Sequence, residues 1–319
     1  LGKDGSVSAL AIYVENTVPN LILEESVLGR MFIDMAGKDP KEVYQAVEAN
    51  SLGLSEAQPL QTREEGMNAM LAGNLLLLVE GYDKGLKIGS KGYPARSVAN
   101  TDTEKVLRGS NEGFTESVKT NTALIRKRIR STDMKVEELT AGVRSNTRLV
   151  LVYMKELVYP EVLEQIRRGI DQFVIDGVLD SGIIEQLTEE DWVSPFPQFQ
   201  TTERPDLAAM EVLDGRVVLL CDNSPVALLL PSVFQDFMNV TEDRYNRFEI
   251  ASFERVIRYA AMIFSFLLSG TYLAVIGFHT MILPTNLILS FAESRQGVPF
   301  PSLLEVLFME LAFELIREA

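Results

Sequence analysis

The feature that most constrains this chain is the segment at residues 259–278, which reads YAAMIFSFLLSGTYLAVIGF and contains no charged side chain. A helix rises about 1.5 Å per residue, so this segment would be about 30 Å long and would match the hydrocarbon core of a bilayer. The alternative is a helix buried in a soluble protein, but such a helix seldom lacks a polar face over this length. We therefore predict a membrane-spanning helix.

The composition limits the functions that the remaining residues can have. Apolar residues make up 46% and charged residues 24% of the 319 residues, as in folded proteins. The net charge of −15 argues against nucleic acid as a partner, because phosphate binding requires clustered cations. The single cysteine and single histidine cannot form an intrachain disulfide or a zinc site of the Cys₄ or Cys₂His₂ type. We expect no metal and no cofactor, and we expect Cys221 to be a buried strand thiol.

Two stretches upstream of the apolar segment show the same order of predicted elements. SALAIYVENTVPNLILEESV and TRLVLVYMKELVYPEVLEQI each read as a strand, a turn with a proline, and a helix. Further on, TREEGMNAMLAGNLLLLVEGYDKGLKI and TERPDLAAMEVLDGRVVLLCDNSPVALLL each predict a helix followed by two strands. Each helix is predicted to begin near a threonine cap, Thr62 or Thr202, and to end at Gly73 or Gly215. We predict an α/β fold of two small duplicated subdomains, each a mixed sheet covered by helices.

These elements divide the chain into three predicted regions. Residues 1–109 form the first subdomain with a polar hinge at 90–109, and residues 110–240 form the second subdomain. Residues 241–319 begin a helical membrane domain, in which 259–278 is the span, 281–292 a re-entrant segment and 302–319 an acidic amphipathic helix.

The second subdomain is predicted to begin with a helix and a hairpin. The helix lies in GFTESVKTNTALIRKRIR and is expected to be capped by Ser110 or Asn111. The hairpin follows it and turns at residues 144–146.

The flanks of the apolar segment predict its orientation. Arginines precede it at positions 244, 247, 255 and 258, and no basic residue follows until Arg295. The positive-inside rule therefore places the N-terminal part in the cytoplasm. The chain begins at Leu1 without a methionine and stops at Ala319 within a helical pattern, so we expect it to be part of a longer protein.

Sequence motifs of enzymes are absent. There is no Walker loop, no G-x-G-x-x-G, no H-E-x-x-H and no Ser–His or Cys–His pair apart from what His279 could form. Asp176 and Asp180 in IDGVLDSG would suit acid–base chemistry, but an aspartate ahead of GIIEQL is more typical of a helix cap. We therefore expect a protein that is not an enzyme.

Charged residues indicate places where a ligand would bind. Arg126 belongs to a basic cluster at a helix C-terminus, which relieves the helix dipole; a lipid-headgroup or anion contact is the alternative. Glu203 and Arg204 in TERPD fit either a salt-bridged helix start or a ligand anchor. If two lobes close on a small nutrient, we expect Arg126, Asp180, Glu203 and Arg204 to line the cleft.

Three glutamates form a stripe on the last predicted helix. Glu310, Glu314 and Glu318 recur at i, i+4 spacing. Carboxylates beside apolar segments are costly in hydrocarbon, so they should face water or a partner. Repeated by symmetry, they would line a cation pathway; an amphipathic helix on the membrane surface is the alternative.

Several long motifs resemble those of one known family. They are RGSNEGFTESVKTNTALIRKRIR, VEEL, IDGVLDSGIIEQL, SPFPQFQTTERPD, LDGRVVLLCDNSP and SFAESRQGVPFPSLLEVLFMELAFELIREA. In this order they resemble the A subunit of GerA-type spore germinant receptors and the related stage V sporulation protein AF. The resemblance covers residues 105–319, and Gln296 stands where the family motif SREGVPFP has a glutamate.

The resemblance implies a nutrient-sensor subunit in the inner membrane of a bacterial spore, with two cytoplasmic α/β subdomains and several membrane helices. It implies a transporter-like B subunit and a lipoprotein C subunit as partners, contact with membrane lipid, and a homo-oligomeric channel that releases ions. It implies no enzymatic activity. An accessory protein of the AF type and a module that binds a nutrient in its interdomain cleft are the alternatives.

Overall fold

A computed structural model describes most of the chain, which divides into two compact units, residues 1–237 and 238–319. The described residues are 1–15, 17–18, 22–49, 57–89, 104, 106, 109–172, 174–189, 193–194, 197–294 and 300–318. The predicted hinge at 90–109 therefore lies outside the described residues except for Glu104, Val106 and Gly109, and Gln296 also lies outside them.

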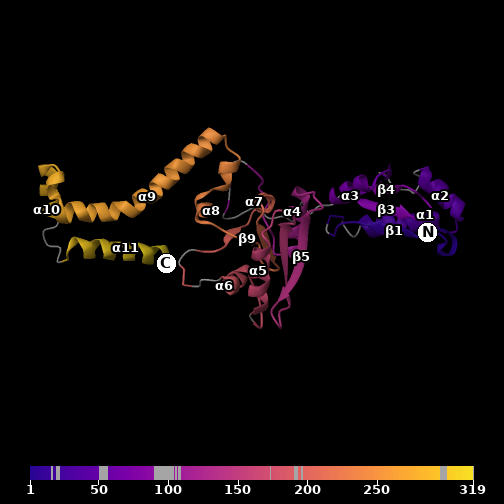
Figure 1. Ribbon diagram of the computed structural model, residues 1–319, viewed down its shortest axis with the longest axis horizontal. Coiled ribbons are helices and arrows are strands. Elements are labelled where there is room, and N and C mark those ends of the chain that lie inside the picture. The colour runs from indigo at the N-terminus through magenta and orange to yellow at the C-terminus, as the bar shows by residue number, and fades with distance from the viewer. Residues whose placement is uncertain are drawn as a thin grey trace. The chain divides into compact units, whose positions relative to one another are not determined.

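The first subdomain is a four-stranded antiparallel sheet with helices (Figure 1). Its strands, β1 (Ala9–Ile12), β2 (Ala57–Leu60), β3 (Leu75–Val79) and β4 (Gly85–Ile88), are arranged in the order β1-β3-β4-β2. A π-helical segment, Ile22–Gly29, continues into α1 (Arg30–Met35), and α2 (Pro40–Glu48) and α3 (Arg63–Leu71) follow. Met31, Met35 and Val43 from the helices share one core with Leu75 and Leu77 of the central strand β3.

The second subdomain has a five-stranded antiparallel sheet with helices on both faces. The strands are β5 (Met134–Ala141), β6 (Thr147–Met154), β7 (Gln200–Thr202), β8 (Val217–Cys221) and β9 (Ala227–Leu230), in the order β5-β6-β8-β9-β7. α4 (Val118–Arg128) and α7 (Pro205–Leu213) pack with Val150 and Val218 on one face. α5 (Pro160–Gln172) and α6 (Ser181–Thr188) pack with Leu149 and Val217 on the other. Because both faces are covered, β6, β8 and β9 read as continuous apolar runs.

The two sheets confirm the predicted duplication. The order β1-β3-β4-β2 equals the order β6-β8-β9-β7, and α3 and α7 occupy the same place between the second and third strands of each copy. All pairings are antiparallel rather than mixed. β5 is an additional edge strand that forms the predicted hairpin with β6, through a turn in which Asn146 has φ of 47°.

Helix boundaries are partly as predicted. Thr62 caps α3, with Glu65 N donating to Thr62 Oγ1 at 3.2 Å, and the chain leaves α3 and α7 through Gly73 and Gly215 at φ of 83° and 91°. The predicted cap at Thr202 is wrong, because Thr202 pairs within β7 and α7 begins only at Pro205.

The predicted cap of α4 at Ser110 or Asn111 is also wrong. α4 begins at Val118, and Ser117 Oγ accepts from Thr120 N at 3.4 Å. The preceding residues are held outside the helix because Asn121 bonds with both the N–H and the carbonyl of Thr115.

The second unit consists of helices. After α8 (Phe234–Met238) and a short 3₁₀ turn at Thr241–Arg244, the long helix α9 (Phe248–Phe278) begins upstream of the predicted span. In the described part of the chain, α9 is the helix that is long and apolar enough to cross a membrane. α10 (Thr285–Ser294) and α11 (Ser302–Glu318) correspond to the predicted re-entrant and acidic segments, and α11 runs beside α9 (Figure 1).

Candidate functional site

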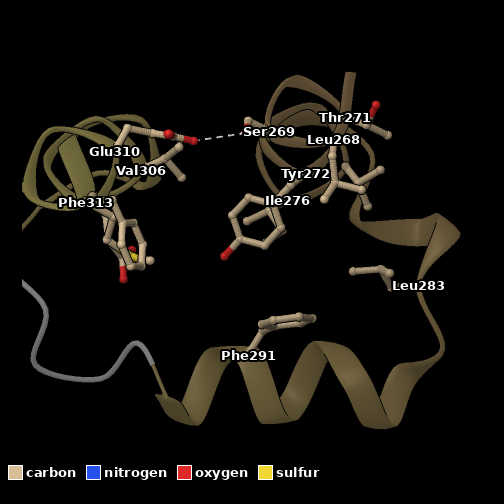
Figure 2. A pocket seen from close by; sticks show the side chains of 13 residues that line it. Leu268, Ser269, Thr271, Tyr272, Ile276, Leu283, Phe291, Val306, Glu310 and Phe313 are labelled. Atoms are coloured by element: carbon tan, nitrogen blue, oxygen red, sulfur yellow. Dashed lines mark hydrogen bonds between the residues drawn. The ribbon is translucent and has the colours of Figure 1, made fainter. Parts of the chain in front are cut away.

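A cavity of about 610 Å³ lies among α9, α10 and α11. Its walls are mostly apolar side chains from all three helices and from the turn before α10, including Leu268, Tyr272, Ile276, Leu283, Phe291 and Phe313. Figure 2 shows Tyr272 and Ile276 of α9 facing Phe291 of α10 across the space. The cavity is thus shaped by helix packing within the predicted membrane domain.

A few polar groups interrupt this apolar wall. Ser269 Oγ on α9 donates a hydrogen bond to Glu310 Oε1 on α11 at 3.3 Å (Figure 2). Glu305 and Thr271 also line the cavity. Glu310 is an exposed residue, and its carboxylate carries the charge that attracts a cation. The arrangement can therefore hold a cation or an amine.

The other two glutamates of the predicted stripe lie differently. Glu314 forms an ion pair with Arg317 three residues along α11. Glu318 is exposed at the last residue of the helix. Since residues on a helix rotate by about 100° per position, a stripe at i, i+4 spacing drifts around the helix. Of the three glutamates, Glu310 lines the cavity.

Arg204 is at the centre of a buried network in the second subdomain. Its side chain is 0% exposed, and Nε and Nη2 donate to Asp206 Oδ1 and Oδ2 at 3.2 and 2.7 Å. Nη1 donates to the carbonyl of Glu104 at 3.1 Å. This confirms the salt-bridged helix start that TERPD predicts, whereas a ligand role for Arg204 stays a prediction.

The same network fixes Glu104 at the start of α7. Thr202 Oγ1 and Glu203 N donate to Glu104 Oε2 at 2.7 and 3.1 Å. Burial raises the pKa of Glu104 above its usual value, and these hydrogen bonds and Arg204 only partly oppose that rise. Glu203 and Arg204, which are neighbours in the chain, both contact Glu104. They connect the chain upstream of the second subdomain to its sheet.

The remaining predicted ligand residues lie on other elements. Asp180 caps α6, with Gly182 N donating to Oδ2 at 3.4 Å, which confirms the cap interpretation. A hydrogen bond from Ser224 lowers the pKa of Asp180 despite partial burial. Arg126 lies on α4 and lines a separate small cavity.

Two charged clusters near the unit boundary were not predicted from sequence. Arg216, the residue before β8, bonds to Asp236 at 2.7 Å and forms an ion pair with Glu211 at 3.1 Å, which links α7 to α8. In the second unit, Arg255 and Arg258 share Asp243. The i, i+3 spacing of these two arginines places them on one helix face and was the available indication of a common partner.

The described residues contain neither a metal-binding group nor a reactive thiol. Across those residues, no group of three or more His, Cys, Asp or Glu side chains is arranged to hold a metal ion. Burial raises the pKa of Cys221 to about 12, so its thiol stays protonated.

The family described as "Bacillus/Clostridium GerA spore germination protein" matches residues 2–319. Spore germination protein KA of Bacillus subtilis is 33% identical over 100% of this chain and 58% of its own length. Spore germination protein GerLA of Bacillus cereus is 35% identical over 87% of the chain and 56% of its own length. The membrane protein YfkQ of Bacillus subtilis is 36% identical over 97% of the chain.

One solved structure is similar in fold. It is the crystal structure of the N-terminal domain of the A subunit of the Bacillus megaterium spore germinant receptor GerK3. The TM-score is 0.53 at 26% identity, covering 73% of this chain and 86% of that one. The chain spans 58% of the length of KA, 56% of GerLA and 60% of YfkQ.

Proposed function

This chain belongs to the GerA family of spore germination proteins, and from that membership we propose that it acts in germination as the A subunit of a nutrient receptor in the spore inner membrane. The names of the relatives KA and GerLA and the receptor origin of the GerK3 domain support this role. Its partners would be the receptor B and C subunits. It would act by binding and coupling, without catalysis.

We assign the first unit to sensing and coupling on the cytoplasmic side. Arginines at positions 244, 247, 255 and 258 precede the span, which supports this orientation. The connection between the units contains α8, which Arg216 holds through Asp236 at 2.7 Å. A rearrangement of the second subdomain would therefore move the start of the membrane domain.

We assign the second unit to a cation-conducting channel built from several copies with several spans each. The observation that carries this assignment is Glu310, a carboxylate that faces Ser269 in a mostly apolar cavity between helices. Such a group is costly next to hydrocarbon unless it serves a cation or a water-filled path. Glu314 and Glu318 continue the acidic stripe toward the end of α11.

Reconstitution tests the channel directly. The whole chain in liposomes loaded with a potassium-sensitive dye should conduct K⁺. Glu310→Gln should reduce the flux by about tenfold, because each copy of the chain then loses one charge from the ion path. Glu249→Gln, an exposed glutamate in the first turn of α9, is the matched control and should leave the flux unchanged. Equal flux in the wild type and in a variant with Gln at 310, 314 and 318 would exclude these glutamates from the ion path.

An accessory role of the AF type is the second candidate. Stage V sporulation protein AF of Bacillus subtilis is 29% identical over 88% of this chain. A receptor A subunit should be encoded beside genes for B and C subunits, and spores that lack it should stop responding to one nutrient class. Spores that lack an accessory protein should instead respond more slowly to every nutrient.

A further inference from the structure

A second, smaller cavity lies beside α4, β5 and β6, and the turn after β1 borders it. Its volume is about 80 Å³. About 10–15 Å³ of such volume holds one water molecule, so the cavity has room for a carboxylate or phosphate group. Its charged lining residues are Glu15, Lys119, Arg126, Glu138 and Arg148.

Helix spacing and strand register bring these residues together. Lys119 and Arg126 lie two turns apart on the same face of α4. In the β5–β6 ladder, Glu138 is opposite Val150 and Thr140 is opposite Arg148. Glu138 and Arg148 are thus diagonal neighbours on the one face of the sheet that carries Val150 toward α4.

Arg126 differs from the basic residues that follow it. Lys127 and Arg128 bond to the carboxylate of Glu112 at 2.7 and 2.6 Å. The half-buried guanidinium of Arg126 makes no hydrogen bond and no ion pair with any of the residues that the structure describes. Burial lowers the pKa of Arg126, and no anion within the described part of the chain opposes this effect. A desolvated guanidinium without a counter-charge is costly, which makes an anionic ligand favourable here.

The charged side chains that line the cavity carry one net positive charge. Lys119 Nζ is 2.5 Å from Glu15 Oε1, so these two charges neutralise each other. Glu138 and Arg148 are also of opposite sign, and both line the cavity. Arg126 is the remaining charge, which matches a ligand with a single negative charge.

We propose that this cavity binds a small oxyanion, a carboxylate or a phosphate group, whose oxygens accept hydrogen bonds from Arg126 and Arg148. Two planar guanidinium groups suit this chemistry, because each presents paired N–H donors to two oxygens. The site is independent of the proposed channel. Glu15 belongs to the first subdomain and Lys119 to the second, so a bound anion would compete with Glu15 for Lys119.

Calorimetry tests the site on the whole chain in phosphatidylcholine nanodiscs, titrated with sodium phosphate or sodium acetate at constant ionic strength. We expect saturable binding of one or both anions in the wild type. Arg126→Gln should weaken it by about tenfold or more, because one charged hydrogen-bond donor is lost. Arg130→Gln removes the same charge from the exposed residue after α4 and should leave binding unchanged.

Glu15→Gln is a control for the case in which Arg126→Gln binds weakly because it misfolds. It removes the competing carboxylate, so it should tighten binding several-fold, and a damaged fold cannot produce a gain. Adding phosphatidylglycerol to the nanodiscs separates the sources of the anion: a lipid headgroup as ligand would suppress the phosphate heat, whereas a free anion would bind undisturbed. Equal affinity of the wild type and Arg126→Gln, or equal loss in Arg130→Gln, would overturn the proposal.

Discussion

Arg258 donates two hydrogen bonds to the carboxylate of Asp243, from Nη1 to Oδ2 at 3.0 Å and from Nη2 to Oδ1 at 3.2 Å. The same guanidinium donates to the carbonyl of Met238, and Arg255 Nε bonds to Asp243 Oδ2 at 3.2 Å. The Asp243 side chain is 1% exposed. These contacts hold the chain before α9 against the turn of that helix just ahead of the predicted span. A displacement of Met238 would therefore be transmitted to α9 through these hydrogen bonds.

Asp243→Asn should destabilise the second unit by about 1–3 kcal/mol, because charge-assisted hydrogen bonds become neutral ones. Burial raises the pKa of Asp243, but hydrogen bonds from Arg258 and Arg255 outweigh it, so the net pKa lies below the usual value. The stabilisation is therefore complete above about pH 4, the unfolded pKa, and is lost as pH falls through the lower folded pKa. Thermal unfolding of the chain in detergent at several pH values measures both effects.

The control for this experiment is Glu249→Gln, which removes an exposed carboxylate from the first turn of α9. It should lower the free energy of unfolding by clearly less than Asp243→Asn does. A gap between wild type and Asp243→Asn that stayed constant down to the most acid pH would contradict the assigned ionic role.

Arg204→Ala should destabilise the second subdomain by about 3–5 kcal/mol, because it leaves Asp206 buried without its partner. It also removes the donor to the Glu104 carbonyl. Replacing both partners with apolar residues, Arg204→Met with Asp206→Leu, should recover part of the loss, since no unpaired charge remains. Urea unfolding of the two variants and the wild type provides the comparison, and a double variant less stable than Arg204→Ala would refute this account.

The sequence predicted the duplicated fold because each copy repeats local patterns that tertiary packing did not override. Gly73 and Gly215 mark helix ends in both copies, and Thr62 fits a capping box. The pattern failed at Thr202, where long-range pairing with Ala227 in β9 extends a strand up to the residues before α7. Strand pairing depends on residues far away in the chain, so local cap rules do not detect it.

The candidate sites were less predictable for the same reason. The sequence predicted Glu310 only as one of three glutamates in a stripe, because its contact with Ser269 joins residues 41 positions apart. Arg126 was one of several adjacent basic residues. That Arg126 has no partner among the described residues becomes visible only once Glu112 is seen to bind Lys127 and Arg128.

Gly215→Ala should destabilise the second subdomain by more than Gly37→Ala destabilises the first. Both glycines have positive φ, 91° and 77°, so alanine costs about 1–2 kcal/mol at either position. At Gly215 an added Cβ would also lie 3.0 Å from the carbonyl oxygen of Leu157, whereas nothing lies within 4 Å at Gly37. Thermal melts of the two variants measure the difference. Equal losses of stability would show that the backbone at Leu157 shifts to accommodate the added Cβ at no energetic cost.

The single cysteine makes membrane topology directly measurable. Cys221 is 0% exposed and its pKa is raised to about 12, so the native chain should not react with a membrane-impermeant maleimide at pH 7. A second cysteine therefore reports its own location. Glu249→Cys lies at the exposed start of α9, and Met281→Cys lies beyond its end, where the side chain is 97% exposed. In intact cells we expect the maleimide to label Met281→Cys but not Glu249→Cys, and in inside-out vesicles the reverse, because the arginines ahead of α9 stay in the cytoplasm. Labelling of both positions from the same side would mean that α9 does not cross the membrane, and the opposite pattern would invert the proposed orientation.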